Sequence, residues 1–313
     1  MEIQVFLPIL VGLILFFFGL ALMRTGLEAL AQGRRQEIIA RFARTPLYGF
    51  ITGTLVTAFL QSSSAVTILI VGFVNAGILT FSQSIGLILG ANVGTTLTLQ
   101  ILAFSLEDFL LPLFLISFLF WLMPERRVKR IGLAMGGVTL MLLSLSVMGS
   151  GARLLLEDSF TRPFFLRINE NPLIAFSLGL LATALIQSST AMLATTMIFM
   201  KNQMISLPAG VAILLGSNIG TCLDTYLSSI GGSPEGKKVA YAHILLNVGG
   251  ALLFLPLLHP FSTFISHLSP DAERQLAHAQ TLFNLVTSLF VLPFSAHFAR
   301  LIERITGKEK SPC

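Results

Sequence analysis

The sequence predicts an all-α polytopic membrane protein built from two inverted-topology repeats, and three observations carry this prediction. Hydrophobic residues make up 54% of the 313-residue chain and charged residues only 11%, with a mean hydropathy of +0.83, whereas soluble domains carry roughly a quarter charged residues. Several apolar runs reach the roughly 20 residues that cross a bilayer. Residues 46–98 also match residues 172–224 without a gap. An ordinary cytosolic enzyme, a disordered scaffold and a secreted disulfide module are therefore excluded.

Each repeat is expected to contain the same kinds of segment in the same order. Repeat 1 covers about residues 3–123 and repeat 2 about residues 130–258, within a single transmembrane transport domain, 1–313. A full helix opens and another closes each repeat: 3–23 and 109–123 in the first, 131–156 and 238–258 in the second. An extra helix, 276–299, and a cytoplasmic tail, 300–313, follow.

Between its full helices, each repeat holds two short apolar stretches that are too short to cross the membrane singly. Each pair is therefore expected to form a re-entrant helical hairpin. The pairs are 46–60 with 64–78, and 172–186 with 190–203. Their tips read Gln-Ser-Ser-Ser at 61–64 and Gln-Ser-Ser-Thr at 187–190.

Each hairpin is followed by a longer apolar stretch that is interrupted near its middle. Stretches 81–104 and 207–230 are broken by Gly-Ala-Asn-Val-Gly and Gly-Ser-Asn-Ile-Gly. If the hairpins return to their own side, each repeat crosses the membrane three times, and this odd number inverts the second repeat relative to the first. The two tips then enter from opposite sides and can meet near mid-membrane. Inverted repeats with paired interrupted segments indicate a secondary transporter.

Basic residues gather on one predicted face of the membrane. Most of the 20 Lys and Arg residues fall near 24–45, 125–130, 233–238 and in the tail. The positive-inside rule places these loops in the cytoplasm, with the N-terminus outside and the C-terminus inside a cell inner or plasma membrane. The isoelectric point near 9.6 therefore reflects topology, and nucleic acid is not an expected partner. Residues 3–30 lack a basic n-region and are expected to be a retained helix rather than a signal peptide.

The hairpin tips have the chemistry of an oxyanion site. Serine and threonine are good N-caps, and a half-helix that begins at mid-membrane presents unpaired N–H groups and the positive end of its dipole. Two converging tips can then surround a tetrahedral oxyanion without a fixed cation. The predicted anion-binding residues are Gln61, Ser62, Ser63, Ser64, Gln187, Ser188, Ser189 and Thr190. The alternative is that small residues here only permit close helix packing.

The interrupted helices have the complementary chemistry. Unwinding at 92–94 and 218–220 is expected to free backbone carbonyls, and neutral oxygens suit a hard monovalent cation such as sodium. The predicted sodium ligands are Asn92, Thr95, Thr96, Asn218, Thr221 and Asp224. Asp224 is the one carboxylate that we place within a span, and an intramembrane acid is a functional-site hypothesis by default. The alternative is that Asp224 lies near the headgroups, bonded to Tyr226 or Lys237.

Enzymatic chemistry is not expected. The tip serines have no paired base, and the sequence contains neither a G-x-S-x-G nor an H-E-x-x-H motif. The five histidines are scattered without metal-ligand spacing, so no cofactor is expected besides Na⁺ as a coupling ion. His243 and Asn247, one helical turn apart, are expected to form a packing hydrogen-bond pair.

The doubled motif resembles the signature of the type II sodium-dependent phosphate cotransporters and their bacterial relatives. The similarity lies in Gln-Ser-Ser-Ser/Thr followed by Gly-(Ala/Ser)-Asn-(Val/Ile)-Gly-Thr, and extends to residues 15–27 and Ala-His-x-x-x-Asn at 242–247. The resemblance implies that the tips contribute to a phosphate site and the broken helices to sodium binding. Gln280 departs from it, because the family pattern and an internal echo of residues 242–256 at 279–293 both place histidine there. The chain also departs from the many bacterial relatives that carry a cytosolic helical regulatory domain, because it ends about 14 residues after its last expected helix. We therefore expect a bacterial-type member without a C-terminal regulatory domain and without in-cis regulation.

The functional hypothesis is sodium-coupled symport of inorganic phosphate across the plasma membrane by alternating access. The expected partners are phosphate, Na⁺ and the lipid bilayer, with a homodimer by analogy only. An alternative within the same fold is phosphate export, or transport of another small oxyanion such as sulfate, because neutral donors discriminate weakly between tetrahedral anions. A third hypothesis, from another class, is a non-transporting membrane sensor or scaffold.

Overall fold

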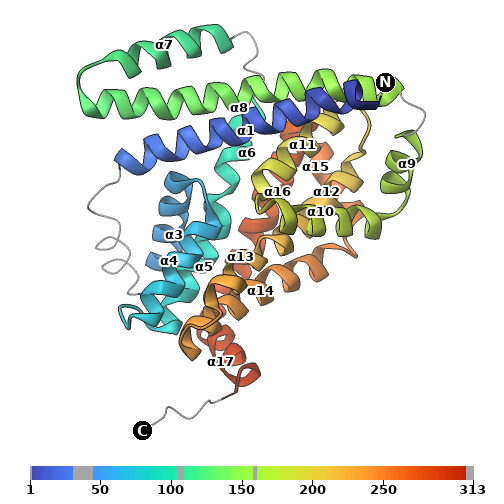
Figure 1. Cartoon of the computed structure of the whole chain (residues 1–313). Helices are drawn as coiled ribbons and strands as arrows, with labels where there is room; N and C mark the ends of the chain where they lie inside the picture. Colours follow the sequence, from blue (N-terminus) through green and yellow to red (C-terminus); the bar gives the residue numbers. More distant parts are fainter. Residues whose placement is uncertain (1, 31–44, 105–108, 158–160, 308–313) are drawn as a thin grey trace.

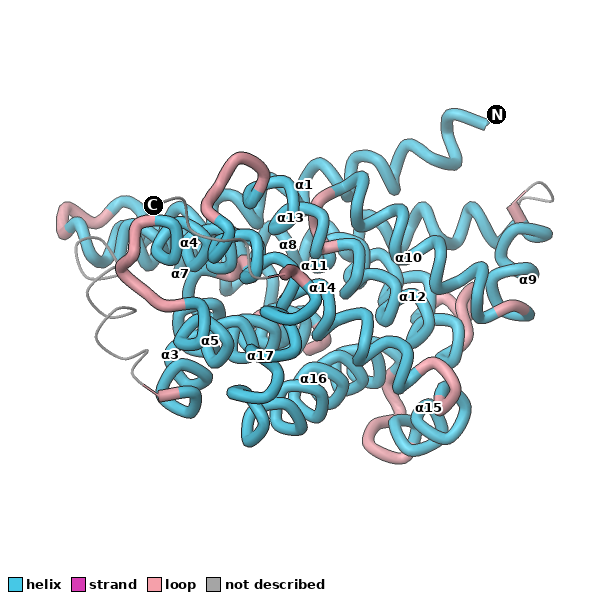
Figure 2. The backbone as a smooth tube through the Cα atoms, turned by 90° about the horizontal axis from the view of Figure 1, so that it is seen from below, coloured by secondary structure: helices cyan, strands magenta, loops and turns pink. Residues whose placement is uncertain are grey.

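A computed structural model describes residues 2–30, 45–104, 109–157 and 161–307 (Figure 1). Within these ranges every regular element is a helix and no strand is present, which confirms the all-α fold class (Figure 2). Five helices are long and apolar enough to cross a membrane, or up to seven if each of two bent helix pairs is one span. Many large apolar side chains on the outer surface are exposed, as contact with lipid requires.

A layer of long helices lies along one side of the molecule. In it, α1 (Glu2–Leu30) packs against α8 (Arg126–Glu157), and α7 (Leu110–Leu122) packs on the far side of α8 (Figure 1). The two long helices run antiparallel, because Gly12 faces Met148 while Gly26 faces Ala134. Glycine lets their backbones come this close, since any side chain would meet the neighbouring main chain.

The contacts between α1 and α8 also map onto one another at an offset of 125 residues. The contact of Gly12 with Met148 has its image in that of Gly137 with Met23. The contact of Gly26 with Ala134 likewise has its image in that of Gly151 with Ile9. Equivalent helices of the two repeats therefore meet each other in reciprocal, antiparallel fashion.

Under this layer, each repeat contributes a helical hairpin and an interrupted helix. In the first repeat these are α3 (Pro46–Leu60) with α4 (Ser63–Asn75), and α5 (Phe81–Gly94) with α6 (Thr96–Leu102). In the second they are α10 (Pro172–Ile186) with α11 (Ser189–Lys201), and α12 (Leu207–Gly220) with α13 (Cys222–Ser229). The elements have the same bounds at an offset of 126, except that α13 is one residue longer than α6.

Glycines fix how each interrupted helix packs against the first half of its hairpin. A Cβ on Gly90 would overlap the carbonyl oxygen of Phe50, and one on Gly216 would overlap that of Phe176. These are again equivalent contacts in the two repeats. The glycines of the predicted breaks therefore serve helix packing and hold each break beside a hairpin.

The remaining helices pack across the repeats and divide the apolar core into two clusters. Helix α14 (Pro234–Phe254) joins α4 and α5 in one cluster, together with α17 (Ser295–Ile305). Helix α16 (Ala272–Val291) joins α11 and α12 in the other, with α1 and α8. The hairpin of repeat 1 thus packs against α14, which closes repeat 2, and the hairpin of repeat 2 packs against α16, which follows it.

Four sequence expectations need correction at the level of the elements. Helix α7 has 13 residues, fewer than the roughly 20 that a span needs, although 109–123 was expected to cross. The helix expected over 238–258 ends at Phe254 and bends by 83° into α15 (Leu258–Ser266). The extra helix changes to a 3-10 turn at Leu292–Phe294 before α17. Helices α9 (Arg162–Glu170) and α15 were not expected at all.

The expected basic loops are only partly within the described residues. Arg24 was assigned to the loop 24–45, yet it lies inside α1, which continues to Leu30. Residues 31–44, with the remaining arginines of that loop, and 308–313 in the tail lie outside the described residues. The membrane orientation therefore stays a prediction.

The glycine contacts lead to a stability prediction. Gly90→Ala or Gly216→Ala should destabilise the protein by about 1–3 kcal/mol, because the added methyl group overpacks against a main-chain carbonyl. Thermal melting in detergent measures the effect. The matched control is Gly249→Ala in α14, where a Cβ meets nothing within 4 Å, and helix propensity should raise stability by up to about 1 kcal/mol. Equal melting of all three variants would contradict the packing described here.

Candidate functional site

Both hairpin tips have the same backbone geometry. Gln61 and Gln187 end α3 and α10 in the left-handed region, with φ of 55° and 57°. Non-glycine residues rarely adopt this conformation, which costs of order 1 kcal/mol or more. Each N–H bonds one turn back, to the carbonyl of Thr57 or Thr183. A matched, strained glutamine in two separate turns indicates that the turn geometry itself is needed.

Each tip then starts a new helix with a serine cap. Ser62 and Ser188 are extended, and their hydroxyls accept hydrogen bonds from the N–H groups of Ala65, at 3.1 Å, and Ala191, at 3.2 Å. The first N–H groups of α4 and α11 consequently point toward the tips with the positive ends of both helix dipoles. This is the arrangement predicted for an anion site, now present at both tips.

The first tip is covered by a cation from the long-helix layer. The Arg24 guanidinium donates to the main-chain carbonyl of Gln61 from Nε, at 3.3 Å, and Nη2, at 3.0 Å. Thr98 Oγ1 donates to the Gln61 side-chain oxygen, and the Gln61 amide donates to the carbonyl of Ala58. Gln61 is accordingly only 5% exposed. The expectation of a site without a fixed cation is therefore wrong at tip 1, where Arg24 lies.

The second tip has a different environment. Gln187 is exposed, Ser188 and Ser189 are half-buried, and Thr190 is buried. No hydrogen bond joins the Gln187 side chain to any residue within the described ranges. The cause lies in the long helices, since α1 packs against α3 whereas its counterpart α8 packs against α11. The two tip glutamines thus have different environments: Gln61 is buried and Gln187 is exposed.

A hydrogen bond joins the first tip to the second repeat. Ser64 Oγ donates to Asp224 Oδ2 at 2.9 Å, and Asp224 lies in the first turn of α13. The alternative that Asp224 bonds Tyr226 or Lys237 is not what the structure shows. Correspondingly, α4 packs against α13 and α11 packs against α6, so each hairpin meets the interrupted helix of the other repeat.

The predicted sodium ligands lie at the interruptions, but these are narrower than expected. Each helix is interrupted at a single residue, Thr95 or Thr221, whose backbone stays in the right-handed helical region. The hydroxyls of Thr95 and Thr96 donate to the carbonyls of Asn92 and Val93, both at 2.8 Å. Extended unwinding was therefore a wrong expectation, because hydroxyl groups take up the carbonyls that the break would free.

The asparagines beside the breaks are buried and bonded differently. Asn92 Nδ2 donates to Asn247 Oδ1 on α14 at 3.2 Å, whereas Asn218 Nδ2 donates to the carbonyl of Leu214 at 2.8 Å. Thr221 Oγ1 donates to the carbonyl of Asn218 at 2.7 Å. His243 Nδ1 lies 3.1 Å from Thr225 Oγ1, and the Asn247 amide donates to the main-chain carbonyl of His243 at 2.9 Å. The two side chains therefore make packing hydrogen bonds, as expected, but not with each other.

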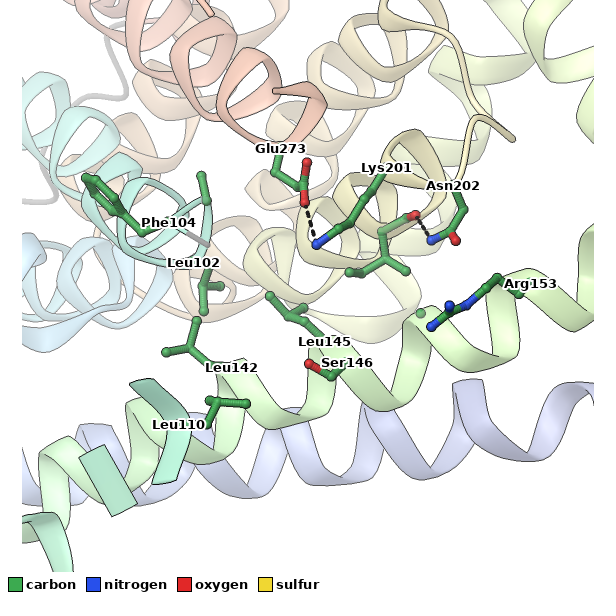
Figure 3. Close-up of a pocket in the computed structure, with 13 residues that line it drawn as sticks. Leu102, Phe104, Leu110, Leu142, Leu145, Ser146, Arg153, Lys201, Asn202 and Glu273 are labelled. Atoms are coloured by element: carbon green, nitrogen blue, oxygen red, sulfur yellow. Dashed lines mark hydrogen bonds and ion pairs between the residues drawn. The ribbon is translucent and has the colours of Figure 1, made fainter. Parts of the chain in front are cut away.

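A cavity of about 340 Å³, lined by both polar and apolar side chains, lies away from the tips, at the opposite ends of α6 and α11 (Figure 3). Arg153 from α8 lines it, as does Lys201, which forms an ion pair with Glu273 at the start of α16, 3.1 Å from nitrogen to oxygen. Helix α6 starts directly after the first break, at Thr95, and α11 starts at the second tip. The cavity therefore lies at the far ends of two helices that begin at the candidate site.

Fold and site together define a class of protein, a multi-pass α-helical membrane transporter. The model of the Na⁺/Pi-cotransporter family matches the chain in two successive segments, residues 15–150 and 147–267. The chain belongs to the Na⁺/Pi-cotransporter family. The first match extends into the expected second repeat, so the two matches do not have the same bounds as the two repeats.

Relatives extend over nearly the whole chain. "Uncharacterized protein YqeW" of Bacillus subtilis is 35% identical over 292 residues, which cover 93% of this chain and 95% of that protein. "Putative inorganic phosphate export protein YjbB" of Escherichia coli is 27% identical over 304 residues, 97% of this chain but 56% of its own length. This chain thus spans little more than half of YjbB.

A shorter similarity reaches an animal transporter. "Sodium-dependent phosphate transport protein 2A" of Oryctolagus cuniculus is 45% identical over 58 residues, 18% of this chain and 9% of that protein. No solved structure matches the chain.

The link between the tip and the second repeat is testable by a double-mutant cycle. Ser64→Ala and Asp224→Ala should be coupled by about 0.5–2 kcal/mol in the free energy of unfolding, because a hydroxyl–carboxylate bond is lost once. The control pairs Ser64→Ala with Ser228→Ala, whose hydroxyl bonds only the carbonyl of Thr225 in its own helix. Strict additivity in the first cycle would show that the Ser64–Asp224 bond contributes nothing.

Proposed function

We propose that this protein moves inorganic phosphate across the plasma membrane, coupled to Na⁺, by alternating access. The observation that carries the proposal is the pair of matched hairpin tips, each a serine-capped helix start, in which Gln61 is buried and Gln187 is exposed. Family membership and the names of two relatives support phosphate as the anion.

The proposed phosphate site uses the tip residues Gln61, Ser62, Ser63, Ser64, Gln187, Ser188, Ser189 and Thr190, with Arg24 added. Helix N–H groups and hydroxyls supply donors to the phosphate oxygens, and the helix dipoles favour its negative charge. Arg24 holds the backbone of tip 1 and supplies the one positive charge bonded to either tip within the described residues.

Inverted repeats supply the proposed transport cycle. The reciprocal, antiparallel contacts of α1 and α8 support an inverted relation between the repeats. In such a pair, the two tips exchange environments when one repeat moves against the other, so that the site opens to each side in turn. The positive-inside rule gives the proposed orientation, with the N-terminus outside and the C-terminus cytoplasmic.

Na⁺ coupling follows from charge in a cavity of low dielectric constant. A phosphate dianion is costly to hold there alone, and Na⁺ bound near Asp224 and the Asn-Gly-Thr breaks offsets part of that charge. Each solute then favours binding of the other by the same free energy.

Phosphate export is the second candidate, and the name of YjbB favours it because this relative covers 97% of the chain. The site chemistry serves either direction, since the ion gradients set the direction of net flux. Measuring phosphate retention in cells that overproduce the protein distinguishes the two, because an exporter lowers the intracellular level and an importer raises it.

The direct test is radiolabelled phosphate uptake into proteoliposomes under an inward Na⁺ gradient, compared with an equal K⁺ gradient. Uptake should require Na⁺, and competition by excess unlabelled phosphate or sulfate shows which of the two anions the site prefers. Equal, negligible uptake with both cations, in protein that melts cooperatively, would refute Na⁺-coupled phosphate transport.

Removing the tip hydroxyls should abolish this uptake. Ser62→Ala/Ser63→Ala and Ser188→Ala/Ser189→Ala each delete two donors, and at about 1.5 kcal/mol per hydrogen bond to a charged group the loss is roughly 100-fold. The matched control is Ser266→Ala in α15, whose hydroxyl bonds only the carbonyl of Thr263. Wild-type uptake in both double variants would exclude the tips as the phosphate site.

Arg24 should act through its charge and its hydrogen bonds to tip 1. Arg24→Ala should lower kcat/KM for phosphate at least about tenfold, whereas Arg24→Lys keeps the charge but not the two-nitrogen contact and should be intermediate. Initial uptake rates at several phosphate concentrations give kcat/KM for each variant and so distinguish the effect of the charge from that of the two-nitrogen contact. Identical kinetics for wild type and Arg24→Ala would remove this residue from the proposed site.

A further inference from the structure

Helix α16 takes the place that the repeat relation assigns to α7. In the first cluster, α14 packs against α4, α5 and α13. The equivalent elements of the other repeat are α11, α12 and α6, and it is α16 that packs against all three, while α7 packs against α8. The echo between residues 242–256 and 279–293 has this structural basis, and at its offset of 37 residues His243 corresponds to Gln280 and Asn247 to Asn284.

In α14, both side chains of the pair have partners. Asn247 Oδ1 accepts from Asn92 Nδ2 at 3.2 Å, and its own amide donates to the carbonyl of His243 at 2.9 Å. His243 Nδ1 meets Thr225 Oγ1 at 3.1 Å. These bonds tie α14 to both interrupted helices, α5 and α13.

In α16, the equivalent pair lacks the equivalent partners. The Asn284 amide donates to the carbonyl of Gln280 at 3.1 Å, as in α14. Yet Asn284 Oδ1 and Gln280 Oε1 have no hydrogen-bond partner, although the two residues are only 1% and 2% exposed. A buried carbonyl oxygen without a donor is costly, so these two oxygens need an occupant.

The missing donors are explained by two differences between the repeats. Asn218, the counterpart of Asn92, gives its amide to the carbonyl of Leu214, which leaves its carbonyl oxygen for other partners. Leu99, the counterpart of Thr225, has no hydroxyl. The repeat relation therefore assigns to Asn218 the position beside α16 that Asn92 has beside α14, with the Asn218 amide already bonded within α12.

We infer that Gln280 and Asn284, with Asn218 across the α12–α16 contact, form a site for a dehydrated monovalent cation. Neutral carbonyl oxygens with no competing donor are the ligands that a hard monovalent ion prefers inside a membrane protein. The identification of the ion as Na⁺ rests on the proposed function. Asn218 is then shared between the second break and α16, so ion binding fastens α16 to the second repeat.

Equilibrium binding of ²²Na⁺ to the purified full chain in detergent, without phosphate and with choline as the replacement cation, tests this site. The variant Gln280→Leu/Asn284→Leu keeps side-chain size but removes both oxygens. It should bind one Na⁺ fewer per chain than wild type, or bind it at least about tenfold more weakly. The control Gln275→Leu removes an amide from the first turns of the same helix, where it bonds the carbonyl of Ser269, and should bind Na⁺ as wild type does.

Asn284→Asp keeps the test decisive if the leucine variant does not fold. A carboxylate in place of the amide oxygen should tighten Na⁺ binding several-fold and raise the Na⁺-dependent part of the melting temperature. Unchanged Na⁺ stoichiometry and affinity in the leucine variant, or in Asn284→Asp, would overturn the inference. Water would then be the partner of the Gln280 and Asn284 side-chain oxygens.

The same measurement separates this inference from the proposed function. If wild type binds Na⁺ and the leucine variant binds it equally well, the α16 site is wrong and Na⁺-coupled transport stands. If the variant loses Na⁺ but phosphate uptake by wild type proves independent of Na⁺, the site stands and the coupling is wrong. If wild type binds no Na⁺, both are refuted.

Discussion

The need to satisfy backbone polar groups without water is the constraint on which the rest of the structure depends. Apolar helices are interrupted here at two hairpin turns and two breaks, and lipid offers no partner for the groups that each interruption frees. Side-chain hydroxyls of the chain itself bond these groups. Ser62 and Ser188 cap the new helix starts, while Thr95 and Thr221 bond the carbonyls before the breaks. The polar groups that make the interruptions possible are the same groups that make a site for small ions.

Close backbone approach is the second requirement, and glycine meets it. Gly90 and Gly216 let each interrupted helix lie directly on the main chain of its hairpin, and Gly12 and Gly26 let α1 lie on α8. These contacts set the distance between tip and break in each repeat. Because equivalent glycines set equivalent contacts, two sequences that differ at most positions form the same local arrangement twice.

The functional interest lies in how the two repeats differ. Arg24 corresponds to Gly149, so only tip 1 receives a guanidinium from the long-helix layer. Asp224 corresponds to Thr98, so the carboxylate bonded to Ser64 and the hydroxyl bonded to Gln61 both contact the first tip. Three partners thus contact the first tip and leave Gln61 buried, whereas Gln187 of the second tip is exposed. In the proposed transport cycle, movement of one repeat against the other exchanges these two environments.

Composition, the doubled motif and the length of the apolar runs determined the fold class and both hairpin turns. Both features depend on local chemistry. Apolar side chains partition into lipid, and a serine that follows a glutamine in the left-handed conformation caps the next helix through contacts within the same short segment. The position of the breaks followed from the same motif, but their narrowness did not, because the carbonyls are taken up by threonine hydroxyls whose rotamers the sequence does not specify. Only the tertiary structure decided which residues bond Gln61, Asp224 and Asn247. It also decided that α16, and not α7, packs against the hairpin and the interrupted helix. Arg24 reads as a loop cation in the sequence and lies 37 positions from the residue it bonds. Contacts over such separations depend on how whole helices pack, and that packing is fixed by the assembled bundle rather than by any segment alone.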